Sequence, residues 1–201
     1  MLRMVFFLKG STGSTEKELS YYGTATALSV ARMYLAGVSV GDYVLFGGGF
    51  TGSSFSDVVD AYNTSLTRST PTALSVARYA LAGASVGNYA LFGGGAAGLP
   101  SDVVDAYNTS LTRSIPTSLS VARYYLVGAS VGDYALFGGG TDDESIFTTV
   151  DAYNMSLTRS TPTALSEGRY FLAGASVGDY ALFGGGYTGS VSSVVDAYEF
   201  S

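Results

Sequence analysis

The sequence predicts an all-β fold, a β-propeller of four blades with four antiparallel strands in each blade. Three observations lead to this fold. The motif Gly-Gly-Gly recurs at an almost constant interval, short apolar segments alternate with two-residue turns, and no segment has the apolar period of a helix. Together they indicate a tandem repeat of one sheet-forming unit. We place the repeats at residues 19–201, after an N-terminal extension at residues 1–18.

The repeat unit is about 46 residues long, which lies within the range of propeller blades and of helical-pair solenoids. An arginine and an Asp-Ala-Tyr triplet recur in the same rhythm as the glycine motif. The glycine motifs begin at Gly47, Gly93, Gly138 and Gly184, the arginines stand at Arg32, Arg78, Arg123 and Arg169, and the aspartates at Asp60, Asp105, Asp151 and Asp196.

The strand signals of one unit decide in favour of a propeller blade. In the second unit the expected strands are residues 81–86, 89–92, 102–107 and 110–114. Gly87 and Asn88 separate the first two strands, and a Gly-Asp pair stands there in the other units. Glycine in first place supplies the positive φ that a two-residue type II′ turn requires. Four short strands in each unit match one blade.

The two ends of the repeat array predict how the propeller closes. Residues 19–26 align with the fourth strand of a unit, whereas the last unit stops before its own fourth strand. We therefore expect residues 19–26 to pair, as an outer strand, with residues 194–198 and to close a four-bladed ring in a monomer. The alternative is an eight-bladed ring in which two chains exchange this strand.

Composition argues against several classes of function. The chain has no histidine and no cysteine, so the commonest general base and the thiolate nucleophiles and metal ligands are missing. A net charge of −6 argues against nucleic acid as a partner. No apolar run reaches the ~20 residues of a membrane span, and no signal peptide is predicted, which leaves the cytoplasm as the default compartment. We expect no enzyme activity, metal or cofactor.

The repeats resemble those of the kelch family over residues 19–201. The resemblance rests on the arginine before the first strand, the double glycine that ends the second, as in Phe46-Gly47-Gly48, and Tyr62 of the third. The tryptophan that usually follows in the family is absent, and four units are fewer than the family's usual number of blades. The resemblance implies a propeller that binds a partner at one mouth of its channel, with the repeated arginines as structural donors.

Variation between the units predicts where a ligand binds. The units differ mainly in the loops between the second and third strands and at the second residue after each arginine. Because strands in a blade alternate in direction, we expect these positions around one mouth of the channel, where loops on a rigid scaffold usually bind ligands. The candidate ligand-binding residues are Tyr34, Tyr125, Phe171, Arg32, Arg78, Arg123, Arg169, Phe50, Tyr187, Asp142, Asp143 and Glu144.

The candidate residues predict a non-catalytic scaffold for a protein or peptide partner, with the aromatic side chains as anchors. A carbohydrate-binding, lectin-like propeller is one alternative, in which the rings stack on sugars and the acidic residues bind hydroxyl groups. A purely structural repeat protein is another. For the repeated arginines and aspartates, pairing with each other or with backbone inside one blade is the alternative to ligand binding. The acidic run lacks the ligand spacing of a calcium loop.

Overall fold

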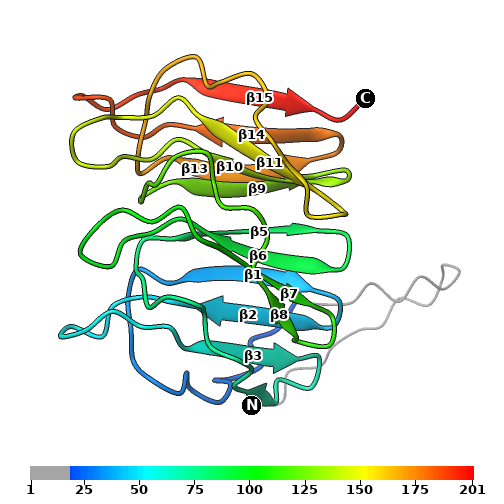
Figure 1. Ribbon diagram of the computed structural model, residues 1–201. Helices are drawn as coiled ribbons and strands as arrows, with labels where there is room; N and C mark the ends of the chain where they lie inside the picture. The colour runs from blue at the N-terminus through cyan, green and yellow to red at the C-terminus, as the bar shows by residue number, and fades with distance from the viewer. Residues whose placement is uncertain (1–18) are drawn as a thin grey trace, which may run out of the picture.

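The computed structural model describes residues 19–201, and the predicted N-terminal extension at residues 1–18 lies outside the described residues. The described chain is all-β, with strands arranged in four antiparallel sheets (Figure 1). Between residues 19 and 201 there is no helix that is long and apolar enough to cross a membrane.

Each sheet consists of strands that are consecutive in the chain, as the repeat predicts. The first contains β1 (Ala36–Val40), β2 (Tyr43–Gly47), β3 (Val59–Asn63) and β4 (Arg68–Ser69). The second contains β5 (Ala82–Val86), β6 (Tyr89–Gly93), β7 (Val104–Asn108) and β8 (Arg113–Ser114). The third contains β9 (Val127–Val131), β10 (Tyr134–Gly138), β11 (Val150–Asn154) and β12 (Arg159–Ser160). The last contains β13 (Ala173–Val177), β14 (Tyr180–Gly184) and β15 (Val195–Glu199).

The turns inside each sheet follow from local sequence. Gly87 has a φ of 50°, as the predicted hairpin requires, and Val86 pairs directly with Tyr89 across it. The fourth strand is shorter than predicted, two residues in place of five. The reason is the side chain of Asn108, whose Oδ1 accepts hydrogen bonds from the backbone N–H groups of Ser110 and Thr112 and curls the chain before β8.

Neighbouring sheets pack face to face, with β1, β5, β9 and β13 side by side in chain order. Three apolar cores fill the three interfaces. In the core between the second and third sheets, one face contributes Ala84 and Val86, and the facing sheet contributes Leu126, Phe137 and Tyr153. The same division of small and large side chains recurs in the other two cores, so each sheet has one face of each kind.

Gly128 marks a very close approach between two inner strands. A methyl group on its Cα would lie 2.1 Å from the carbonyl oxygen of Gly83, a backbone atom that cannot rotate away. We expect Gly128→Ala to lower the free energy of unfolding by about 1–3 kcal/mol, as overpacked cores do, measured by urea denaturation. Leu99→Ala is the control, because Leu99 is 78% exposed. An unchanged stability of Gly128→Ala would contradict this packing.

The predicted closure of the ring by residues 19–26 is not found in the structure. These residues form no strand, and within the described chain the last sheet ends at β15 without a fourth strand. Tyr62 of β3 instead donates a hydrogen bond of 2.7 Å to the carbonyl oxygen of Thr26, which ties the segment to the first sheet. The first and last sheets lie at opposite ends of the molecule (Figure 1). The segment therefore cannot pair with residues 194–198 in this arrangement.

Candidate functional site

Nine aromatic side chains form a continuous surface along one side of the sheet array, where the loops between second and third strands lie. We call this group the aromatic surface. Each ring lies near at least one other, with the centroids of linked rings 4.1 to 6.5 Å apart. All four repeats contribute. The members are Tyr34, Phe50, Phe55, Tyr79, Tyr124, Tyr125, Tyr170, Phe171 and Tyr187.

Backbone bridges hold the residues that follow the repeated arginines next to the loops between the second and third strands. In each repeat the residue directly after the repeated arginine forms an isolated β-bridge with the residue that opens the loop between the second and third strands. The bridged pairs are Met33 and Phe50, Tyr79 and Ala96, Tyr124 and Thr141, and Tyr170 and Tyr187. The variable loops and the connections between sheets therefore lie on the same side of the array, as the strand directions predict.

The second residue after each arginine has an unusual backbone conformation. Tyr34, Ala80, Tyr125 and Phe171 have φ values of 56°, 54°, 52° and 55°, although none is a glycine. Such residues are strained unless their surroundings hold them in place. Here a backbone ladder does so, because Ala80 N donates to Tyr34 O at 2.9 Å, Tyr125 N to Ala80 O at 3.0 Å, and Phe171 N to Tyr125 O at 3.2 Å. The ladder fixes these four positions side by side.

Two hollows lie on the aromatic surface. The first, of about 330 Å³, is lined by the four residues of the backbone ladder and by the leucine that follows each of them. The second, also of about 330 Å³, lies between the third and fourth repeats and is bounded by Tyr124, Tyr170 and Phe171 with Thr141 and Asp143. The first hollow presents polar and apolar surface in similar measure, and the second adds a hydroxyl group and a carboxylate to its rings.

The acidic run of the third repeat lies beside the second hollow. The hydroxyl group of Tyr124 donates a hydrogen bond to Asp143, and this bond, with burial, raises the pKa of Tyr124, so the phenol stays neutral. Asp142 closes its own loop by accepting hydrogen bonds from the N–H groups of Ser145 at 2.7 Å and Glu144 at 3.1 Å. No group of three or more carboxylates suited to a metal occurs among residues 19–201.

The side chains of the four repeated arginines are buried and do not belong to the aromatic surface. The side chain of Arg78 is fully buried, with Nη1 2.8 Å from Oδ2 of Asp105 and further bonds to the carbonyl oxygens of Gly94 and Phe92. Burial lowers the pKa of Arg78, and Asp105 opposes this effect. The corresponding pairs are Arg32 with Asp60, Arg123 with Asp151 and Arg169 with Asp196. Pairing within one sheet, the alternative to ligand binding, is thus found in every repeat.

The aspartate of each pair also holds the segment that leads into its sheet. Oδ1 of Asp105 accepts a hydrogen bond of 3.0 Å from the backbone N–H of Ser75, which precedes the second sheet. The same bond joins Ser29 to Asp60, Ser120 to Asp151 and Ser166 to Asp196. Although burial opposes it, hydrogen bonds from Ser29 and Arg32 lower the pKa of Asp60. These carboxylates therefore have a structural role, since each binds an arginine and a backbone N–H group.

The structure brings some of the predicted site residues together and adds four residues that were not predicted. Of the predicted aromatic residues, Tyr34, Phe50, Tyr125, Phe171 and Tyr187 all belong to the aromatic surface, and Asp143 lies at its edge. Asp142 and Glu144 lie in the same loop as Asp143, and Asp142 is engaged in closing it. The prediction missed Phe55, Tyr79, Tyr124 and Tyr170. A signal for the three tyrosines was present, since an aromatic residue directly follows the arginine in three of the four repeats.

Comparison with known proteins adds no assignment to this geometry. No protein-family model matches the chain, and no curated protein matches it. The aromatic surface is therefore the basis for a functional proposal.

Proposed function

We propose that the chain is a non-catalytic binding scaffold that holds a protein or peptide partner on the aromatic surface. The observation that carries the proposal is the continuity of nine rings across four repeats. Aromatic side chains bury a large area and dominate the energetics of many protein interfaces. Tyr34 and Phe171 are 51% and 59% exposed, and the backbone ladder holds them in place before a partner arrives. A preorganised surface loses less entropy on binding.

The chemistry of the surface supports binding rather than catalysis. Catalysis by proton transfer needs an acid and a base with suitable pKa values within reach of one substrate. The aspartates of the Asp-Ala-Tyr triplets are engaged with arginines inside the sheets. The second hollow instead offers aromatic rings and the Tyr124–Asp143 hydrogen bond, in which the phenol is kept neutral. Such a surface suits apolar and hydrogen-bonding side chains of a peptide.

We also propose that the array is part of a kelch-like propeller ring. Three features support this architecture. The arginine before the first strand of each sheet donates to carbonyl groups within that sheet, as Arg78 does to Phe92 O at 3.0 Å. The third-strand tyrosine ties each sheet to the connection before it, as Tyr107 does through Thr72 O at 2.8 Å. The second-strand phenylalanine of one sheet packs over a glycine of the preceding sheet, as Phe137 does over Gly93.

A carbohydrate ligand is the second candidate, and the second hollow favours it. Sugars bind where aromatic rings provide an apolar platform and polar groups next to them meet the hydroxyl groups. Tyr170 and Phe171 supply the rings, with centroids 4.8 Å apart, and Asp143 and Thr141 supply the polar groups. Peptide binding and sugar binding would use the same surface. An experiment that offers both kinds of ligand to the same protein can therefore tell them apart.

Selection from a random peptide library on the immobilised chain, with a glycan array run on the same protein, tests the proposal. We expect saturable binding of selected peptides, weakened at least about tenfold by Tyr125→Ala or Phe171→Ala, since Tyr125 links rings of the other three repeats and Phe171 packs on it with centroids 4.1 Å apart. Tyr134→Ala is the control, because Tyr134 is 37% exposed but begins β10, away from the surface. Binding that both ring variants keep would contradict the proposed surface. Sugar binding lost in the same two variants would instead assign the surface to carbohydrate.

A further inference from the structure

The last sheet exposes a face that every other sheet buries. Val195 of β15 is 60% exposed, whereas its counterparts Val150 and Val104 are 1% and 0% exposed. Val177 of β13 is 65% exposed, and its counterpart Val131 is 7% exposed. In the first three sheets these side chains form the apolar cores against the following sheet. Among residues 19–201, the last sheet therefore carries one half of a repeat interface that no other sheet covers.

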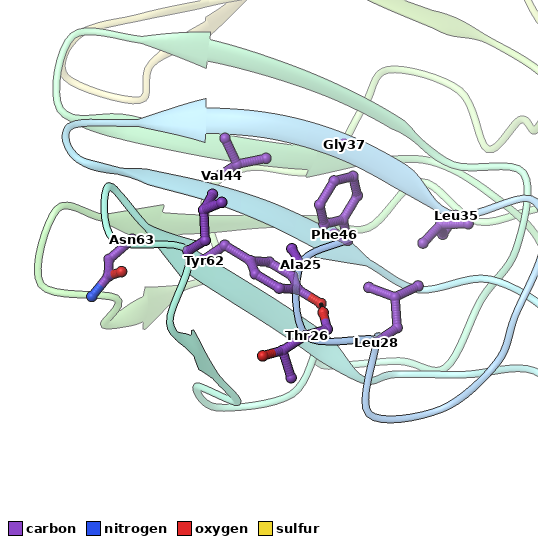
Figure 2. Close-up of a pocket in the computed structure, with 10 residues that line it drawn as sticks. Ala25, Thr26, Leu28, Leu35, Gly37, Val44, Phe46, Tyr62 and Asn63 are labelled. Atoms are coloured by element: carbon purple, nitrogen blue, oxygen red, sulfur yellow. Dashed lines mark hydrogen bonds between the residues drawn. The ribbon is translucent and has the colours of Figure 1, made fainter. Parts of the chain in front are cut away.

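The first sheet carries the missing half. An apolar groove of about 720 Å³ opens on its free face (Figure 2). The lining includes Leu28, Leu35, Val44, Phe46, Tyr62 and Leu66. The residues at the same places in the second repeat are Leu74, Leu81, Ala90, Phe92, Tyr107 and Leu111, and all six belong to, or pack on, the core between the first and second sheets. The groove is therefore an interface of the repeat that lacks its preceding sheet.

Close contacts show the same complementarity. A methyl group on Gly138 would lie 3.2 Å from the ring of Phe183, but a methyl group on Gly184 would meet only Val195 of its own sheet at 3.5 Å. Phe46, which lines the groove, occupies in the first sheet the place of Phe183 in the last. The backbone ladder also has two open ends. Among residues 19–201, Tyr34 N–H and Phe171 C=O have no partner within it.

We propose that the groove of the first sheet binds the exposed face of the last sheet of a second copy of this chain. Two such junctions would join two chains into a ring of eight sheets. The occupant is a second copy because the last sheet of the same chain lies at the opposite end of the array (Figure 1), and β1 and β13 do not pack as β1 and β5 do. Three internal interfaces of the same kind are already present. The proposal does not depend on what the aromatic surface binds.

The unpaired segment at residues 19–26 fits this assembly. Tyr22 and Gly23 lie ahead of the first sheet at the position that Arg68 and Ser69 of β4 hold ahead of the second sheet, and Tyr22 is 84% exposed. β4 pairs with β3 and so completes the sheet that comes before it in the chain. The equivalent partner for Tyr22 and Gly23 is β15 of the second copy, whose sheet has three strands among residues 19–201. The junction differs from the internal interfaces at Val44, which stands where the other repeats have alanine.

The mass of the full chain in solution tests the proposal. Light scattering after size-exclusion chromatography, over a range of concentrations, is expected to give about twice the 20.7 kDa mass of one chain. A single-chain mass at every concentration would overturn the proposal. A mass that keeps growing beyond two chains would overturn the closed ring of eight sheets.

Two variants with a charge on one end face each sharpen the test. Val44→Glu and Val195→Glu replace side chains that are 40% and 60% exposed in the single chain, so each variant is expected to fold, as circular dichroism and thermal melting would show. Each alone is expected to have the mass of one chain. Leu99→Glu, in a loop outside both faces and 78% exposed, is the matched control and is expected to keep the mass of two chains.

Mixing the two variants distinguishes a second copy from closure within one chain. Val44→Glu keeps an intact last sheet, and Val195→Glu keeps an intact groove. The mixture is therefore expected to form a pair through one junction and to regain a mass of two chains. Closure within one chain would leave the mixture at the mass of one chain. Folded variants that each keep the two-chain mass alone, or a mixture that stays at one chain, would overturn the proposal.

Discussion

Asp105→Ala is expected to lower the free energy of unfolding by about 3–5 kcal/mol, because it leaves a buried charge without its partner. The side chains of Arg78 and Asp105 are both 0% exposed, and Nη1 lies 2.8 Å from Oδ2. Removing the carboxylate also leaves the backbone N–H of Ser75 without its acceptor, so the connection from the first to the second sheet is loosened. Urea denaturation followed by circular dichroism measures the loss.

Asp102→Ala is the matched control for this prediction. Asp102 precedes the same strand, β7, but its side chain lies at the surface. Surface substitutions away from special features usually change stability by less than about 0.5 kcal/mol. A loss below about 1 kcal/mol in Asp105→Ala would mean that solvent reaches Arg78 when the carboxylate is removed, against the burial described.

Phe137→Ala is the second variant for which we expect a large loss, about 3–5 kcal/mol. The ring is fully buried between the second and third sheets, lies over Gly93, and packs edge-on against Tyr153 with centroids 5.9 Å apart. The two flanking sheets are held by their own strands and cannot collapse fully into the space. The cavity term therefore adds to the lost burial of the ring. The same denaturation experiment measures it.

Phe55→Ala is the control for the loss of a phenylalanine ring. Phe55 is 38% exposed and stacks on Tyr79 with centroids 5.4 Å apart, so its removal opens no cavity inside a core. We expect a loss of about 1 kcal/mol, the contribution of its contacts with other rings. Equal losses for Phe55→Ala and Phe137→Ala would show that the sheet interface is not packed as described.

Most of the sheet architecture could be predicted from sequence because it depends on local chemistry. Gly87 in a two-residue turn and the alternation of short apolar strands define each sheet within about one repeat. The closure could not be predicted in the same way. Alignment of residues 19–26 with a later repeat shows which residues are equivalent, but the rotation from sheet to sheet depends on contacts such as Gly128 on Gly83.

The site was predicted in part for a related reason. Apart from the repeated arginines, the predicted residues were those that differ between repeats, and Tyr125 and Phe171 are of this kind. Tyr79, Tyr124 and Tyr170 recur, which is typical of a framework residue, although here they also contribute to the aromatic surface. The arginines could belong to either class until the structure placed the side chains of Arg78 and its counterparts out of contact with solvent.

The uniformity of the sheet interfaces has a consequence for how the array assembles. Because each interface uses the same pairs of side chains, packing energy hardly distinguishes the correct neighbour from another repeat of the chain. The order of the sheets is therefore imposed by the short connections, such as the segment from Ser69 to Leu81 that Asp105 and Tyr107 anchor. Lengthening such a connection would let a repeat skip its neighbour, the misassembly to which tandem arrays are prone. Chain connectivity, more than side-chain recognition, keeps the repeats in sequence.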